Sequence, residues 1–584
     1  MKILNYFKNI LTGIYSSIRR FPVTIFLSAS VAIVLIIINE TKPITDDLSR
    51  IALALALGIP VSLCIKLFFE RKDEKAPSKY ILGNAIGAVF LFGYYLFFIK
   101  NITMVTGTRY IAVNLAFYMC FLFLPYFYKK ELFEMYVVDI FTGFFTTILY
   151  SAVLYGGLSA ILFAINRLLQ IRVDSNAYYY TFLIVAFIFA VSYFLAEIPY
   201  KTEELTPKKY PKLLRILLLY IVIPLLIAYT AILYIYFGKI IGTRVWPVGI
   251  VSVSHLVIWY AIIVTVVLFF ITPIKDENGW QKNFLKFAPI IIIPLILMMF
   301  VSIGIRINAY GFTERRYYVV ILGLWLLCSM IYFILFSRKL RNIFLPVSLA
   351  VVAIIAVFGP LSSYSISIMS QNNRFQQLLV KNEMLKDGKI EPSTKVSKED
   401  KAQISSIINY FNNQHSLKEA NFLPVGFKMG DMKTALGFDF EYTNTPSNNR
   451  YFYFQRNTSE RGLDISGYDY LFDARQYNSN ENSSGNPVNV TYNYDTSLLK
   501  VFYNNKEVYS NDFNDFVHAL IDKHGIPAQD AKETSMLSGS EMTEIIDTYK
   551  LKIKIIFMSI SGNTSQPQNL EPKGIEFYVL VKVK

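Results

Sequence analysis

The chain has 584 residues, of which 54% are hydrophobic and 17% are charged, and its formal net charge is +15. One water-soluble core could not bury so much apolar surface, so the composition excludes a single soluble globular domain and requires lipid. The basic excess does not indicate a nucleic-acid partner, because residues 1–360 hold 33 basic and 16 acidic side chains, whereas residues 361–584 hold 24 and 26. We attribute the excess to membrane orientation and to anionic lipid of the inner leaflet.

The first twenty residues predict an amphipathic helix in the inner membrane interface. Ile3, Phe7, Ile10, Leu11 and Ile14 recur at helical spacing among basic side chains, which is typical of a helix lying in that plane. No small-residue cleavage site follows the first apolar run, so residues 1–20 are expected to remain attached.

Residues 21–360 predict a polytopic α-helical membrane bundle of about eleven transmembrane helices. A helix needs about 20 apolar residues to cross a hydrocarbon layer roughly 30 Å thick. Runs of that kind are Phe21–Asn39, Ile51–Phe69, Tyr80–Ile99, Tyr110–Tyr128, Tyr136–Ala164, Tyr178–Ala196, Ile216–Gly238, Ile250–Ile271, Phe287–Ile305, Tyr317–Phe336 and Ile343–Phe358. The fifth run is unusually long and contains Gly156 and Gly157, so it predicts either one tilted helix or a span followed by an interfacial turn.

The distribution of Lys and Arg predicts the orientation. With a cytoplasmic N-terminus, the inner segments hold 21 basic residues and the outer segments 11. Basic residues are retained on the cytoplasmic side, and an odd number of spans then places the C-terminal region outside. The expected location is the cytoplasmic (plasma) membrane, with the lipid bilayer as the first partner.

After Pro360 the composition turns polar and predicts a connecting helix over 361–390 and a soluble, extracytoplasmic α+β domain over 391–584. Helices are expected at Lys398–His415, capped by Ser397, and at Asp512–Lys523. Strand patterns are Phe438–Tyr442, Tyr451–Gln455, Leu463–Phe472, Val488–Tyr494, Lys500–Tyr509 with a turn at Asn504-Asn505, Tyr549–Ser561 and Ile575–Val583.

Cofactor chemistry has little support in the sequence. All three cysteines fall inside predicted spans, and the four histidines lack metal-binding spacing, so neither a disulfide nor a zinc site is expected in the exported region. A Gly-rich phosphate loop and a nucleophile elbow are also absent from the sequence, so no catalytic residue or cofactor is predicted.

The loop between the ninth and tenth predicted spans is the candidate contact for a lipid headgroup or another cell-envelope ligand. Its polar residues are Arg306, Tyr310, Glu314, Arg315, Arg316 and Tyr317. Arginines there could hold a lipid phosphate or an undecaprenyl headgroup. The competing interpretation is local structure, in which Glu314 pairs with an arginine and the tyrosines belong to the interfacial belt. Gln371 and Arg374 are the candidate residues for coupling through the connecting helix.

Several motifs resemble one bacterial family of membrane proteins. They are Gly311-Phe312-Thr313-Glu314-Arg315-Arg316-Tyr317 with Trp325 downstream, Gly359-Pro360, Ser370-Gln371 with Arg374 ahead of Asp387-Gly388-Lys389, Arg19-Arg20-Phe21-Pro22, Tyr155-Gly156-Gly157-Leu158 and Ile465-Ser466-Gly467-Tyr468-Asp469-Tyr470. Together they resemble the family termed domain of unknown function 4153. The resemblance implies the architecture and a bacterial origin, and it implies no activity.

Three functional hypotheses follow. The first is sensing or binding at the envelope through the exported domain. The second is a permease for a small solute or lipid, although no charged side chain is expected at mid-depth of a span. The third is a lipid-linked sugar transferase with Asp46-Asp47 in the first outer loop, although a loop of about eleven residues, 40–50, is short for that chemistry.

Overall fold

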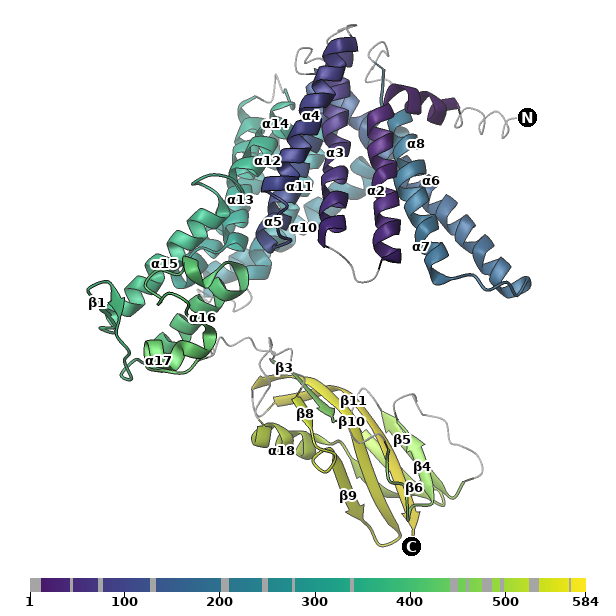
Figure 1. Ribbon diagram of the computed structural model, residues 1–584, viewed down its shortest axis with the longest axis vertical. Coiled ribbons are helices and arrows are strands. Elements are labelled where there is room, and N and C mark those ends of the chain that lie inside the picture. Colours follow the sequence, from purple (N-terminus) through teal and green to yellow (C-terminus); the bar gives the residue numbers. More distant parts are fainter. Residues whose placement is uncertain are drawn as a thin grey trace. The chain divides into compact units, whose positions relative to one another are not determined.

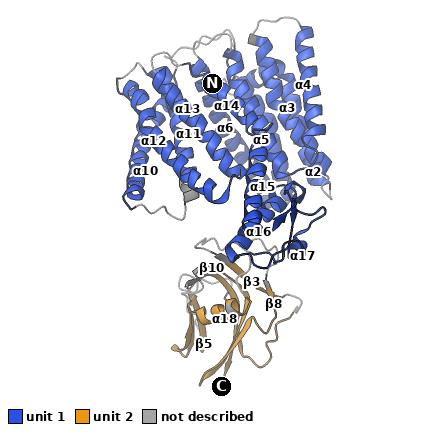
Figure 2. Ribbon diagram, turned by 90° about the vertical axis from the view of Figure 1, so that its left-hand side faces the viewer, with its two compact units in different colours: residues 1–441 blue, residues 442–584 orange. Residues whose placement is uncertain are grey.

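The computed structural model describes residues 12–41, 46–71, 77–126, 133–200, 210–243, 250–275, 279–336, 341–441, 450–457, 462–474, 486–493, 498–524, 535–566 and 569–584. The chain forms two compact units, Met1–Glu441 and Tyr442–Lys584, which Figure 2 distinguishes by colour. Residues 12–20 are helical, and the rest of the expected N-terminal amphipathic helix lies outside the described residues.

In the described part of the first unit, ten helices are long and apolar enough to cross a membrane, and they run side by side in Figure 1. They are α2 (Pro22–Glu40), α3 (Asp46–Arg71), α4 (Pro77–Phe97), α5 (Met104–Phe123) with η1 (Leu124–Tyr126), α6 (Phe133–Leu168), α7 (Ser175–Ile184) continued by η2 (Val185–Phe189) and α8 (Ala190–Ala196), α9 (Lys212–Ile216) continued by η4 (Leu217–Val222) and α10 (Ile223–Thr243), α11 (Ile250–Ile271) with η5 (Thr272–Ile274), α12 (Gly279–Tyr310) and α13 (Glu314–Leu335). The segments η2 and η4 are π-helical turns within otherwise continuous helices.

The fifth predicted span is one continuous helix. Helix α6 has 36 residues and passes through Gly156 and Gly157 without a break. At a rise of 1.5 Å per residue it is roughly 54 Å long, well beyond the thickness of a hydrocarbon layer. The alternative of a span followed by an interfacial turn is therefore wrong.

The eleventh predicted span is shorter than expected, because helix α14 covers only Phe344–Ile355. The start of α14 nevertheless lies beside the end of α13, and the residues after α14 lie beside the start of α13. Phe344 stacks on Tyr332 at 5.2 Å between ring centroids, and the Tyr317 hydroxyl donates to the Leu361 carbonyl just beyond α14. Helix α14 thus runs antiparallel to α13 and returns the chain to the end where α13 begins.

The last part of the first unit lies at one end of the bundle in Figure 1. It contains α15 (Ser363–Lys381), the hairpin β1 (Leu385–Lys386) and β2 (Lys389–Ile390), α16 (Lys398–Gln414), η6 (Leu417–Glu419), η7 (Met429–Asp431) and α17 (Met432–Leu436). Ser362 caps α15 and Ser397 caps α16, each accepting a backbone N–H of the first turn. Phe375, Leu379, Ile404 and Phe411 are fully buried between these helices.

The second unit is an α+β fold with two sheets. One contains β3 (Arg450–Arg456), β4 (Tyr470–Asp473), β8 (Ser535–Leu537), β10 (Leu551–Gln566) and β11 (Asn569–Val583) in the order β4-β11-β10-β3-β8, with β9 (Thr543–Asp547) also paired to β10. The other contains β5 (Val488–Asn493), β6 (Leu498–Tyr503) and β7 (Lys506–Asn511). Phe513, beside helix α18 (Asn514–His524), packs edge-on against Phe557 and Phe577 of the large sheet.

The predicted architecture, a helical membrane bundle followed by an α+β region, is confirmed. Asn504 and Asn505 both adopt positive φ, as the predicted hairpin turn requires. The predicted strand beginning at Phe438 is wrong for its described residues, because Phe438 is buried against α16 and α17 in the first unit. The units also divide after Glu441, whereas the sequence placed a boundary at residue 390.

A candidate anion site beside an apolar groove

The turn between α12 and α13 requires a glycine. Gly311 adopts φ +70°, and a Cβ there would lie 2.9 Å from Gln371 Nε2. The Gln371 amide, buried on α15, donates to the carbonyls of Tyr310 at 3.0 Å and Phe312 at 2.7 Å. Ser370 accepts the Phe312 N–H at 2.9 Å. Helix α15 therefore supplies the hydrogen-bond partners that the turn's backbone needs in place of water.

Arginine side chains converge on this turn. Arg316 donates to the carbonyls of Tyr310 at 3.1 Å and Gly311 at 2.6 Å. Arg374 donates to the same Tyr310 carbonyl at 3.2 Å and to Gln403 on α16 at 2.8 Å. Arg306 and Arg374 both lie within electrostatic range of Arg316. Burial lowers the pKa of Arg374 from its usual value.

Neither Arg316 nor Arg374 forms an ion pair with any residue in the ranges that the structure describes. The hydrogen bonds that they donate to described residues go to neutral carbonyl or amide oxygens. The site therefore carries uncompensated positive charge, and the repulsion between guanidinium groups is relieved most simply by an anion.

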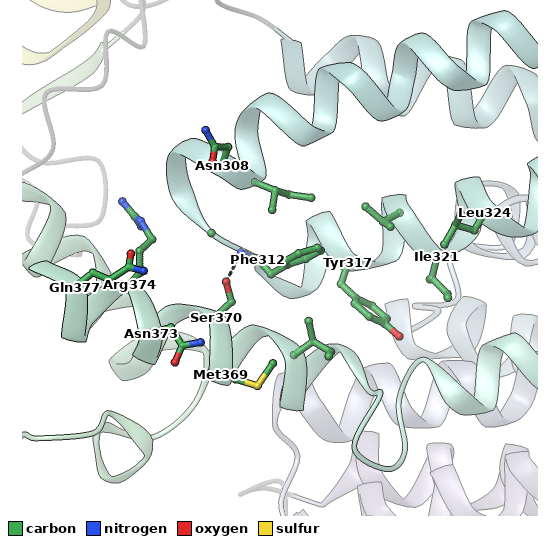
Figure 3. Close-up of a pocket in the computed structure, with 14 residues that line it drawn as sticks. Asn308, Phe312, Tyr317, Ile321, Leu324, Met369, Ser370, Asn373, Arg374 and Gln377 are labelled. Carbon is green, nitrogen blue, oxygen red and sulfur yellow. Dashed lines mark hydrogen bonds between the residues drawn. The ribbon is translucent and has the colours of Figure 1, made fainter.

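A cavity of about 690 Å³ adjoins the arginines between α12, α13 and α15. Figure 3 shows Arg374, Gln377 and Asn373 toward one end and Ile321 and Leu324 toward the other. Its remaining lining residues are Ile307, Asn308, Gly311, Phe312, Tyr317, Val320, Ile366, Met369 and Ser370. The groove is thus amphiphilic, with a polar end beside the guanidinium of Arg374 and an apolar body.

Glu314 faces away from this groove and forms a second cluster. Its side chain is 6% exposed, and Oε1 accepts the Tyr410 hydroxyl and contacts His415 Nε2, each at 2.6 Å. The His415 side chain is 4% exposed. Burial and the hydrogen bond to Glu314 raise the pKa of Tyr410, so its hydroxyl remains a neutral donor. We call Glu314, Tyr410 and His415 the latch, because they join the start of α13 to α16 and the segment after it.

The structure distributes the residues of the predicted contact site among the turn, the groove and the latch. Arg316 and Arg374 meet at the Tyr310 carbonyl, and Gln371 joins them there, so both residues expected to couple the domains contact the turn from α15. Tyr317 lines the groove, and Arg315 is exposed. Glu314 contacts His415. The competing interpretation of the sequence, in which Glu314 pairs with an arginine, placed it differently.

Sequence reasoning missed Ser370 as a partner of the turn, and it missed the latch. Ser370 and Arg374 are separated by one helical turn on α15, so periodicity could have placed them on one face. No pattern around His415 linked it to Glu314, because the two residues are 101 positions apart. Among the described residues, no group of three or more His, Cys, Asp or Glu side chains could hold a metal ion.

The ten long apolar helices among the described residues define a multi-pass integral membrane protein. The model of the family described as Domain of unknown function (DUF4153) matches residues 23–388, more than half of the chain, and the protein belongs to this family. The matched range includes the turn, the groove and α15, and ends before α16. No curated protein and no solved structure matched the chain.

Proposed function

We propose that this protein binds an anionic amphiphile of the bacterial envelope in the groove between α12, α13 and α15, and that it acts as an envelope sensor. The observation that carries the proposal is an apolar cavity with Arg374 at its polar end, where neither Arg374 nor Arg316 has a carboxylate partner among the described residues. Apolar walls accept a hydrocarbon chain, and unpaired guanidinium groups accept a negative headgroup.

Helix α16 supports a route from this site toward the C-terminal unit. Gln403 on α16 receives the hydrogen bond from Arg374. Two residues further, Ser405 accepts the backbone N–H of Glu441, and Lys398 lies 3.7 Å from the Glu441 carboxylate. Glu441 is the last residue of the first unit. A ligand that moves Arg374 would therefore act on the helix that holds the start of the link to the C-terminal unit.

The binding proposal is tested with purified protein in nanodiscs of phosphatidylcholine containing phosphatidylglycerol. Native mass spectrometry counts the anionic lipids that remain bound after release from the nanodisc. We expect Arg374→Gln to reduce that number and Arg172→Gln to leave it unchanged, because Arg172 is an exposed arginine on the segment between α6 and α7. Equal retention by wild type and Arg374→Gln would contradict the site.

The topology belongs to the same proposal, with the N-terminus in the cytoplasm and the C-terminal unit outside. Single cysteines are introduced after the three native ones are replaced, and intact cells are treated with an impermeant maleimide. Lys389→Cys, on exposed β2, should react in intact cells, whereas Lys79→Cys should react only after permeabilisation. The reverse pattern would overturn the orientation.

A further inference from the structure

The Tyr310 carbonyl receives more donors than it can satisfy. Gln371 Nε2, Arg316 Nη1 and Arg374 Nη1 lie 3.0, 3.1 and 3.2 Å from this one oxygen. A carbonyl oxygen has two lone pairs, so three donors share two acceptor positions. Two of the three donors are charged, and charged donors form their strongest hydrogen bonds with anionic oxygens. The turn therefore has surplus donor capacity of the kind that a phosphate uses.

The charge around the turn indicates more than one negative charge on the ligand. Arg316 and Arg374 donate to the same Tyr310 carbonyl, and Arg374 lies within electrostatic range of Arg316, so two positive charges adjoin the turn. The acidic residue nearest in sequence, Glu314, is directed to His415 and Tyr410 and is absent from the groove lining. A phosphate diester carries one negative charge, whereas a phosphate monoester carries about 1.5 to 2 near neutral pH and offers three terminal oxygens.

The shape of the groove identifies a lipid and not a free anion. Ile307, Ile321, Leu324, Ile366 and Met369 form most of its body, and the Met369 side chain is 56% exposed. Ile321 and Leu324 lie away from the arginine end in Figure 3, so a small anion would leave them without a partner. A ligand with a hydrocarbon chain buries them and gains the hydrophobic free energy of that contact.

We infer that the groove selects a lipid with a phosphate monoester headgroup over lipids with phosphate diester headgroups. The inference rests on the proposed function, since it specifies the headgroup taken by the same site. The monoester's oxygens meet the donors of Arg374 at the polar end of the groove, and the chain lies along α13 and α15. Arg316, which shares the Tyr310 carbonyl with Arg374, adds positive charge behind that end. A second negative charge roughly doubles the Coulombic attraction to each guanidinium, so we expect about tenfold or greater preference.

The test compares three preparations of the full-length protein in phosphatidylcholine nanodiscs: with phosphatidic acid, with phosphatidylglycerol, and with inorganic phosphate in the buffer. We expect phosphatidic acid to bind about tenfold more tightly than phosphatidylglycerol at pH near 8. The preference should shrink near pH 5, where the monoester loses its second charge because its second pKa is about 6. Arg374→Gln should reduce the preference, and Arg374→Lys should restore part of it because Lys keeps the charge without the planar fork.

Each outcome decides between the two proposals. Equal binding of the two lipids refutes the headgroup inference and leaves the proposed function standing. Binding of neither lipid refutes both. Stabilisation by inorganic phosphate alone, as strong as that by phosphatidic acid, means that a free anion is the ligand and overturns the lipid assignment. A melting temperature for Arg374→Gln close to that of the wild type shows that its lost preference does not reflect misfolding.

Discussion

Removing Glu314 should open the latch locally without unfolding the bundle. Its carboxylate has two hydrogen-bonding partners at 2.6 Å, Tyr410 and His415, and its side chain is only 6% exposed. Hydrogen bonds to a charged group contribute about 1.5–3 kcal/mol each, so the two together contribute about 3–6 kcal/mol. We therefore expect Glu314→Ala to lower the free energy of local opening by about 3–6 kcal/mol, and Glu314→Gln, which keeps an acceptor oxygen, to lower it less.

Native-state amide hydrogen exchange measures this opening directly. The His415 N–H bonded to Phe411 and the Glu419 N–H bonded to Ser416 report on the segment that the latch holds. Their exchange should accelerate by a factor on the order of 10² to 10⁴ in Glu314→Ala. The matched control is Glu391→Ala, because Glu391 pairs with Lys386 at an exposed site, where solvent screening leaves an ion pair little stabilising effect. Equal effects of the two variants, or acceleration spread equally through α2 and α3, would refute the reasoning.

Three further predictions concern single residues. Gly311→Ala should lower the melting temperature and weaken lipid retention, since a left-handed φ costs an L-residue about 1–2 kcal/mol, whereas Gly304→Ala has open space and should be neutral or stabilising. Burial raises the pKa of Asp400, but hydrogen bonds from Lys381 and Asn382 outweigh this effect, so the pKa is lowered in the folded protein. The stabilisation from the ionised carboxylate is therefore present above the ordinary pKa and is lost as the pH falls through the lowered pKa. Asp400→Asn should abolish this acid sensitivity of α16 in hydrogen-exchange experiments. Trp325→Phe should cost about 1 kcal/mol in denaturant unfolding, because the indole N–H donates to Ser348 across α13 and α14.

The membrane bundle was predictable because lipid imposes a simple rule. Backbone groups must be satisfied inside each crossing segment, so a run of about 20 apolar residues identifies a helix almost regardless of its neighbours. The rule predicted the ten long helices of the described residues. It did not decide whether α6 is one long helix or a span followed by an interfacial turn, because hydropathy does not distinguish the two. It overestimated α14, because hydropathy continues through Ala356 and Phe358 after the regular helix has ended.

The site was predictable only in part, because its contacts join residues that are distant in sequence. The concentration of arginines at the α12–α13 turn was visible, and so was Arg374 on the connecting helix. Their convergence on the Tyr310 carbonyl depends on α15 lying against the turn, which no local pattern encodes. The strand expected at Phe438 failed for a related reason, because alternation of apolar residues does not reveal that Phe438 packs against helices.

The side of the membrane on which the groove lies does not depend on the short helix α14. The Tyr317 hydroxyl, at the start of α13, is bonded to Leu361 just before α15, so α15 lies at the end of the bundle where α12 ends. Helix α12 is the ninth of the long apolar helices. With a cytoplasmic N-terminus and every preceding helix crossing once, its end faces outward whether or not α14 spans the full bilayer. Labelling of Lys389→Cys from outside would support this assignment and fix the side of the membrane on which Arg374 lies.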